Sequence, residues 1–322
     1  MGGNTSGTRG YVEIRFSVMN PLLTTYMKEA ADAGDPFAQF ELGIRLEDGH
    51  DGEQDFEKVS EWYAKAAVQG HGGAEANLLL AHVFGRVGMW SPDHVFRRLV
   101  ELAESGDSDL ENSVGLCYQF GFGVTQDYRE AAKWFLRAAN AGLAEAQFNL
   151  GGIYYEGMGL GKDIGVALGW YTKAAEQRFE LALIHLGSMY QKGIGVEKDL
   201  RRALILYSIA YRRGSVRAAN HLGILFKRGL GVERDDSIAY RLFLECVSSP
   251  DTPVIGENLS YRGTAYYWLG HMAEHGEGVK QDQRAAKNWY SKGAECGQTQ
   301  CIEALARVRP KSRPRHSRGS VG

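Results

Sequence analysis

One short stretch of the chain has the composition of a phosphate-binding turn. The residues "GFGVTQDYREAAKWF" (121–135) place Gly121 and Gly123 ahead of Asp127 and a predicted helix. Glycine-rich turns that lead into helices bind phosphates through free backbone N–H groups. The first question is therefore whether this turn binds a nucleotide or has a role in folding.

Two pairs of histidines have spacings that a metal site would use. His271 and His275 are four residues apart, so on a helix both rings lie on one face. His185 and His221 are 36 residues apart, which is the period of the sequence repeat described below. A zinc site needs at least three protein ligands, and no third ligand is evident beside either pair. The sequence favours solvated or structural histidines, and we predict neither a metal nor a cofactor.

The chain lacks the motifs of two common hydrolases. A serine β-lactamase needs Ser-x-x-Lys, yet no serine here has a lysine three residues later, and His-Glu-x-x-His is also missing. Cys117 and Cys246 are expected to be small buried side chains. Cys296 and Cys301 would pair only in an exported protein. We predict a non-catalytic protein without catalytic residues, located in the reducing cytoplasm.

Composition excludes further classes of function. The 322 residues carry a net charge of −2, which argues against stable nucleic-acid binding, and no apolar stretch is long enough to span a membrane. The start lacks the apolar core of a secretory signal. Two terminal features stay open: "MGGNTS" fits a myristoylation pattern, and the basic tail is expected to be disordered, with at most weak anionic contacts.

The turn at 121–127 belongs to a repeat of 36 residues. A leucine column, a glycine column directly after it, paired glycines and an aspartate column all recur at this step. The leucine column, which we call the repeat leucine, reads Leu42, Leu78, Val114, Leu150, Leu186, Leu222 and, after an insertion, Leu269. Such periods indicate stacked supersecondary units.

Each repeat predicts two helices joined by the glycine turn. Ala146, Leu150 and Tyr154 are spaced i, i+4, i+8 and form one face of a first helix. Gly157 suits the left-handed conformation that ends a helix. Asp127 is a good N-cap for a second helix. The glycines are therefore predicted to join helices rather than to bind phosphate.

These columns resemble the Sel-one-like repeat (SLR) family, a relative of the tetratricopeptide repeats. The segments "AQFNLGGIYYEGMGLGKDIGVALGWYTKAA" (146–175) and "AYYWLGHMAEHGEGVKQDQRAAKNWYSKGA" (265–294) match its pattern A-x-x-x-L-G-x-x-Y-x-x-G-x-G-V-x-x-D-x-x-x-A-x-x-W-Y-x-K-A-A. The resemblance implies an all-α fold, in which antiparallel helix pairs stack into a right-handed superhelical solenoid. It also implies a role as an adaptor or scaffold.

The predicted domain organisation follows from the repeat. A flexible segment (1–20) precedes a solenoid over 21–308, and a basic disordered tail (309–322) follows it. Helices at 21–34 and 298–308 are expected to cap the array, and an insertion lies near 251–261. The seven repeats are predicted near 35–70, 71–106, 107–142, 143–178, 179–214, 215–250 and 262–297.

By analogy with tetratricopeptide arrays, the first helices are expected to line a concave groove. Its variable positions include the residues five and six after the repeat leucine, which become aromatic and then basic along the chain. The predicted partner-binding residues are Phe84, Gln119, Phe120, Tyr155, Lys192, Lys227 and Arg228. The aromatic side chains would supply buried contact and the basic ones would bind a carboxylate. A purely solvated face is the alternative.

We therefore expect a non-catalytic adaptor, a monomer, that binds a protein or peptide partner through its concave face. Two alternatives stay open: a penicillin-binding or β-lactamase-like protein of the cell envelope, and an adaptor of quality control or the secretory pathway. The missing nucleophile motif argues against the first, and the missing signal argues against both.

Overall fold

The computed structural model describes residues 21–47, 56–83, 91–248 and 260–308, and every regular element in these ranges is a helix. None of the described helices is long and apolar enough to cross a membrane. In chain order the helices are α1 (Pro21–Asp32), α2 (Pro36–Glu47), α3 (Phe56–Val68), α4 (Gly72–Val83), α5 (Pro92–Ala103), α6 (Ser108–Phe120), α7 (Tyr128–Asn140), α8 (Ala144–Glu156), α9 (Ile164–Glu176), α10 (Glu180–Lys192), α11 (Leu200–Arg212), α12 (Val216–Arg228), α13 (Asp236–Ser248), α14 (Ser260–His275), α15 (Gln283–Glu295) and α16 (Thr299–Val308).

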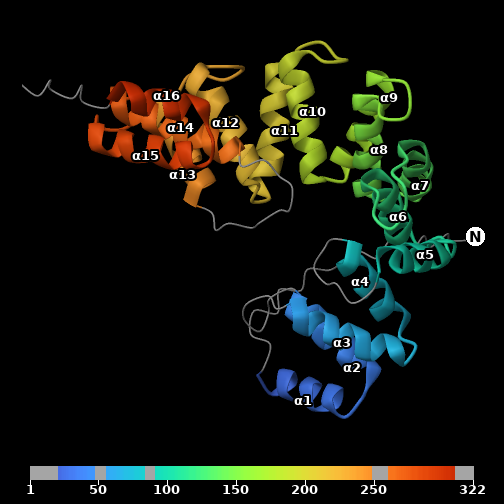
Figure 1. Ribbon diagram of the computed structural model, residues 1–322. Coiled ribbons are helices and arrows are strands. Elements are labelled where there is room, and N and C mark those ends of the chain that lie inside the picture. Colours follow the sequence, from blue (N-terminus) through green and yellow to red (C-terminus); the bar gives the residue numbers. More distant parts are fainter. Residues whose placement is uncertain (1–20, 48–55, 84–90, 249–259, 309–322) are drawn as a thin grey trace, which may run out of the picture. The chain divides into compact units, whose positions relative to one another are not determined.

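The chain forms two compact units, residues 1–131 and 132–322, with the boundary inside α7. In the first unit each helix from α1 to α6 packs against its neighbour in the chain. In the second unit α8/α9, α10/α11, α12/α13 and α14/α15 are the tightest pairs, and each pair also contacts the next (Figure 1). A helix pair alone leaves an apolar face exposed, so stacking is what buries the core of each repeat.

A close approach between helices explains the glycine after the repeat leucine. A Cβ on Gly187 would lie 2.7 Å from the ring of Tyr207, and one on Gly223 would lie 2.7 Å from the ring of Phe243. Both rings are fully buried. The missing side chain therefore lets the second helix of each repeat press an aromatic ring onto the first helix.

The turn between the two helices supplies its own acceptor for the backbone amides that follow it. Gly193 ends α10 in the left-handed conformation, at φ 73°. The Asp199 carboxylate then accepts hydrogen bonds from the backbone N–H groups of Arg201 and Arg202, at 3.0 and 2.9 Å. Asp127 caps α7 in the same way. An aspartate thus holds the amides that would bind a phosphate, which confirms the folding role of this turn.

The all-helical solenoid of stacked pairs is confirmed. The exact number of repeats, the handedness of the superhelix and the domain boundaries stay predictions. Helices α1 and α16 lie where terminal capping helices were expected. The N-terminal segment, the insertion up to residue 259, the basic tail and Phe84 lie outside the described residues.

Candidate partner-binding site

Two of the residues five after the repeat leucine, Gln191 and Glu274, accept hydrogen bonds inside their own repeats. Tyr207 donates its hydroxyl to Gln191 at 2.9 Å, and Tyr290 donates to Glu274 at 2.7 Å. Both hydroxyls belong to second helices and both acceptors to first helices. This column therefore lies at the contact between paired helices, which differs from the open groove expected for it.

Lys227 belongs to this column and is not available to a partner. Its side chain is only 6% exposed, and its Nζ lies 3.0 Å from Asp236 Oδ1 and 2.9 Å from Glu277 Oε2. Asp236 begins α13 of the same repeat, whereas Glu277 follows α14 of the next repeat. Lys227 was expected to bind a partner's carboxylate, but it pairs with two carboxylates of its own chain instead.

Among the described residues, those six after the repeat leucine are exposed to solvent. Lys192 and Arg228 are both exposed, and Lys192 makes no ion pair or hydrogen bond within the described part of the chain. The Arg228 guanidinium carbon lies 5.5 Å from the centre of the Trp268 ring, a cation–π contact. These two cations can therefore still meet a partner's carboxylate.

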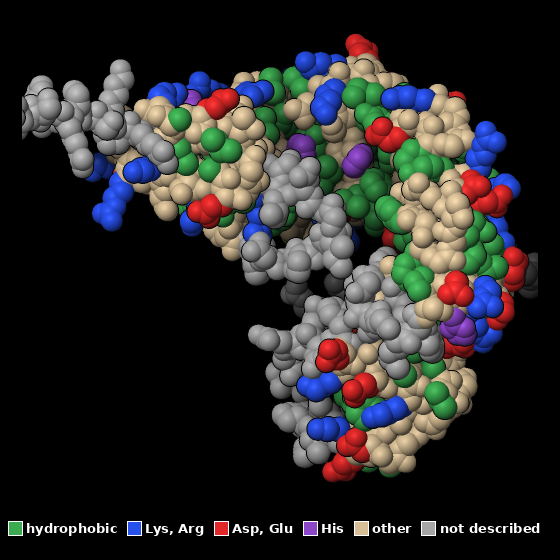
Figure 2. Space-filling model, viewed as in Figure 1, with side chains coloured by type: hydrophobic (Ala, Val, Ile, Leu, Met, Phe, Trp, Pro, Cys, Tyr) green, Lys and Arg blue, Asp and Glu red, His purple; other side chains and the backbone are tan. Residues whose placement is uncertain are grey.

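His185 and His221 lie beside Lys192 among aromatic rings. His185 packs edge-on against Phe148, with ring centres 5.1 Å apart, and the His221 ring stacks on Tyr207 at 4.6 Å. Figure 2 shows histidine side chains set among hydrophobic ones on the second unit.

Both imidazoles are shifted toward their neutral form. Loss of surrounding water lowers the pKa of His185, and burial together with the charge of Lys192 lowers the pKa of His221 to about 4. At pH 7 they therefore offer polar, uncharged ring atoms between Lys192 and the aromatic side chains.

We call the surface formed by Tyr155, His185, Lys192, His221 and Arg228 the first-helix face. Tyr155 is half-buried and joins it through Tyr171, whose ring centre is 6.3 Å away and in turn 5.5 Å from that of His185. The histidines stand directly before the repeat leucine, in a column that also contains Asn149 and Trp268. The high variability of this column is the signal that would have added it to the predicted groove.

The two other predicted residues described by the structure lie in the first unit, on α6. Phe120 is 71% exposed. The Gln119 side-chain oxygen is buried without a hydrogen-bond partner, and its backbone oxygen accepts from Gln126 at 2.7 Å. Phe120 thus presents apolar surface, whereas Gln119 lies mostly inside.

The histidine pairs do not assemble a metal site. His271 Nδ1 lies 3.1 Å from Glu277 Oε2, and His275 Nδ1 lies 2.8 Å from the backbone oxygen of His271. No group of three His, Cys, Asp or Glu side chains suited to a metal occurs among the described residues.

The described cysteines are free thiols. Cys117 and Cys246 are buried as predicted, and burial raises the pKa of both thiols to about 12, which makes them poor nucleophiles.

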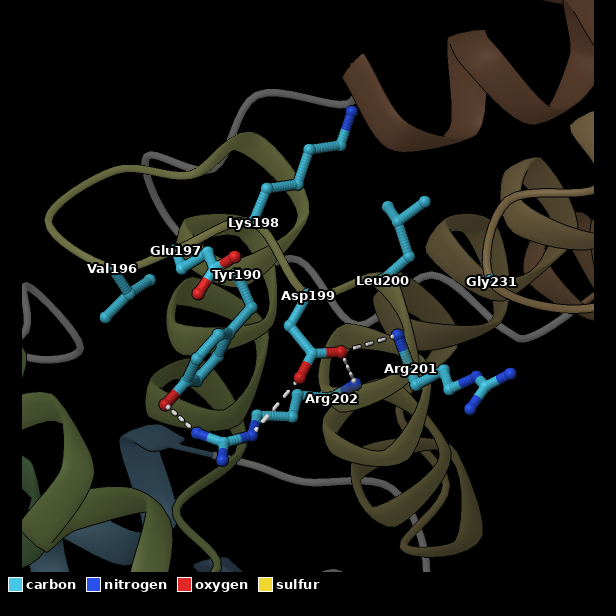
Figure 3. Close-up of a pocket in the computed structure, with 9 residues that line it drawn as sticks. All are labelled: Tyr190, Val196, Glu197, Lys198, Asp199, Leu200, Arg201, Arg202 and Gly231. Carbon is cyan, nitrogen blue, oxygen red and sulfur yellow. Dashed lines mark hydrogen bonds and ion pairs between the residues drawn. The ribbon is translucent and has the colours of Figure 1, made fainter.

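A hollow of about 720 Å³ lies where the α10–α11 turn meets the next repeat, at Gly231 (Figure 3). Its charged side chains are already partly engaged. The Arg202 guanidinium bridges the Tyr190 hydroxyl, at 3.2 Å, and the Asp199 carboxylate, at 3.3 Å. Since Asp199 also caps α11, Asp199 and Arg202 serve the structure of the turn.

Comparison with known protein families supports the repeat found in the sequence. The model of the Sel1 repeat matches residues 36–71, 109–143, 144–179, 181–215, 216–245 and 263–298, which is more than half of the chain. Residues 72–108, between the first two matches, are not matched. They include the part of the chain that departs most from the repeat columns. No curated protein matches this sequence.

Solved structures of similar proteins have the same fold. The chain is 29% identical to c5321, a protective antigen of uropathogenic Escherichia coli strains that displays an SLR fold, with a TM-score of 0.66. That match covers 92% of this chain and 60% of c5321, so this chain spans well under two thirds of that relative's length. A Sel1 repeat protein from Oxalobacter formigenes is 27% identical, with a TM-score of 0.61, over 70% of this chain and 87% of its own. With six matched repeats and this solenoid of helix pairs, the chain belongs to the Sel1 repeat family.

Proposed function

We propose that this protein is a non-catalytic adaptor that binds a protein or peptide partner on the first-helix face. The observation that carries the proposal is the exposure of Lys192 and Arg228 beside half-buried aromatic side chains and neutral imidazoles. Sel1 repeat proteins and related helical-repeat proteins generally bind other proteins, which supports this class of function.

The chemistry of the face indicates the kind of partner. Half-buried rings such as Tyr155 and Trp268 provide apolar contact that is already partly shielded from water, and Lys192 and Arg228 supply positive charge beside it. Interfaces gain most of their affinity from such aromatic anchors, and their orientation from charge complementarity. The best ligand is therefore a segment that combines apolar side chains with Asp or Glu.

The test begins with affinity capture and identification of the bound protein, followed by titration of the purified partner. The variant Lys192→Glu/Arg228→Glu should weaken binding at least about tenfold, because it places acidic groups against an acidic ligand. Lys198→Glu/Arg201→Glu is the matched control, since both residues are exposed and the change in net charge is the same. Equal affinities of the two variants would contradict this site assignment.

Lys227 is left unchanged in this test because its reversal would break internal ion pairs. A chromogenic β-lactam tests the absence of catalysis: measurable turnover by the purified protein would overturn the adaptor assignment. We also propose a monomer located in the cytoplasm, on the sequence grounds given above.

A further inference from the structure

The second helices share a tryptophan position whose ring is covered by a cation. Lys173 Nζ lies 4.1 Å from the centre of the Trp170 ring, and Lys292 Nζ lies 5.1 Å from that of Trp289. Trp134 is covered in the same way. In each case the cation follows three residues after the tryptophan, one turn along the helix. The cation therefore covers one face of the indole.

The repeat formed by α12 and α13 lacks this pair. Leu242 stands in the tryptophan position and Glu245 in the position of the cation. A cavity of about 370 Å³ lies beside Leu242, between α11, α12 and α13. We call it the α11–α13 pocket, and its apolar floor consists of Leu222, Phe226, Ile238 and Leu242. Because leucine is much smaller than an indole, Leu242 leaves more of this space open than a tryptophan at the same position would.

The rim of the pocket is basic. Arg212 and Arg241 line it, are exposed, and make no ion pair or hydrogen bond within the described ranges. Glu245, the acidic residue of the rim, accepts a hydrogen bond from the Tyr211 hydroxyl at 2.5 Å. Ile205, two turns before Arg212 on α11, is 57% exposed and extends the apolar surface. The rim therefore has unused positive charge next to unused apolar area.

We propose that the α11–α13 pocket is a second binding site, which takes a peptide segment of a protein partner with a large aromatic side chain next to Asp or Glu. The aromatic side chain enters the space left by the missing tryptophan. The neighbouring carboxylate meets Arg212 and Arg241. This site lies between the second helices α11 and α13 and the first helix α12, and it shares no residue with the first-helix face.

Three blocked dipeptides probe the pocket in the full chain: acetyl-Trp-Asp-amide, acetyl-Trp-Asn-amide and acetyl-Ala-Asp-amide. Methyl NMR signals of Leu222, Ile238 and Leu242 report on binding. Trp-Asp should shift these signals saturably, Trp-Asn should bind about fivefold more weakly because it lacks the charge, and Ala-Asp should cause no shift.

Leu242→Trp should abolish these shifts, because the larger indole side chain would occupy the pocket that Leu242 lines. Leu206→Trp is the matched control: it is the same substitution in the same column of the preceding repeat, and Leu206 does not line the pocket. In a third variant, Arg212→Gln/Arg241→Gln, Trp-Asp and Trp-Asn should bind equally.

Three results would overturn the proposal. One is the absence of saturable shifts at millimolar Trp-Asp. Another is binding that survives Leu242→Trp in a variant with an unchanged melting temperature. The third is a shift of the same methyl signals with protein concentration alone, which would assign the pocket to a second copy of this chain. If Leu242→Trp does not fold, the arginine variant decides the question, since a persistent preference for Trp-Asp contradicts the assignment.

Discussion

Two neighbouring repeats of the second unit differ in how their paired helices are tied. In α10/α11, the Tyr207 hydroxyl donates to Gln191, so the polar link stays inside the repeat. In α12/α13, Phe243 replaces the tyrosine, and Lys227 instead reaches Asp236 and, in the next repeat, Glu277.

This difference shows that the position five residues after the repeat leucine, occupied by Gln191 and Lys227, can serve two purposes. A tyrosine hydroxyl ties a first helix to its own second helix, whereas its loss frees the column for a lysine that ties successive repeats together. The aromatic packing against the glycine after the repeat leucine is the same in both repeats, since a Cβ added to Gly187 or to Gly223 would lie 2.7 Å from the ring. Only the polar link differs, and that contrast can be tested.

The largest effect is expected from Lys227→Met. The change leaves two partly buried carboxylates without the lysine that bridges them, and loss of one member of a buried ion pair costs about 3 kcal/mol of unfolding free energy. Urea unfolding measures this cost. Arg201→Met, at an exposed position, is the control, and equal costs for both would mean that Lys227 does not link the repeats.

Alanine at either column glycine should cost about 2 kcal/mol, since the added Cβ forces a buried ring to move. Because Gly187 and Gly223 make the same close approach, Gly187→Ala and Gly223→Ala should shift the denaturant midpoint by similar amounts. A large difference between them would show that the two repeats also differ in their apolar packing.

A smaller effect is expected from Tyr207→Phe, which gives α10/α11 the aromatic side chain of its neighbour. The change removes one hydrogen bond to Gln191, worth about 1 kcal/mol. Chemical unfolding of this variant beside Tyr240→Phe, a half-buried tyrosine outside the column, measures the difference. If both variants match the parent chain, the column hydroxyl contributes nothing to stability.

The last comparison separates the polar groups by pH. The folded pKa of His221 is about 4 and lies below its unfolded value of about 6.5, so stability falls as pH drops from about 6.5 to 4. Hydrogen bonds from Arg234 and Lys227 lower the pKa of Asp236, so its contribution is kept until the pH falls below about 4.

NMR titration of the imidazole of His221, with His94 on an exposed face as the reference, checks the first of these pH windows. A midpoint near that of an ordinary histidine would contradict the burial of His221 against Tyr207. Urea unfolding between pH 7 and 3 checks the second, in the parent chain and in Lys227→Met.

The helices, their ends and the buried face of each helix were predictable because they depend on local spacing. Asp127 was predicted as an N-cap and caps α7, and Ala131, Phe135 and Ala138 are all fully buried. Gly157 has φ 77° at the end of α8. These features follow from helix geometry and the preferences of single residues.

The site was less predictable, because it depends on what each side chain meets. Lys192 and Lys227 both looked like free cations, yet only Lys192 is exposed. His185 and His221 were weighed as metal ligands and as solvated or structural residues but not as part of a binding surface, although they lie beside Lys192. The pocket beside Leu242 was visible in the sequence only as a lost tryptophan.

The sequence by itself determined the repeat, the helix pairs and the family, because a 36-residue period of apolar, glycine and aspartate positions recurs whatever the partner is. Only the tertiary structure decided which variable residues remain open to a ligand. The physical reason is that neighbouring side chains decide whether a charge on a helix surface is available to a ligand. Glu277, from another repeat, pairs with Lys227, while Arg228, the next residue along the same helix, stays exposed over Trp268.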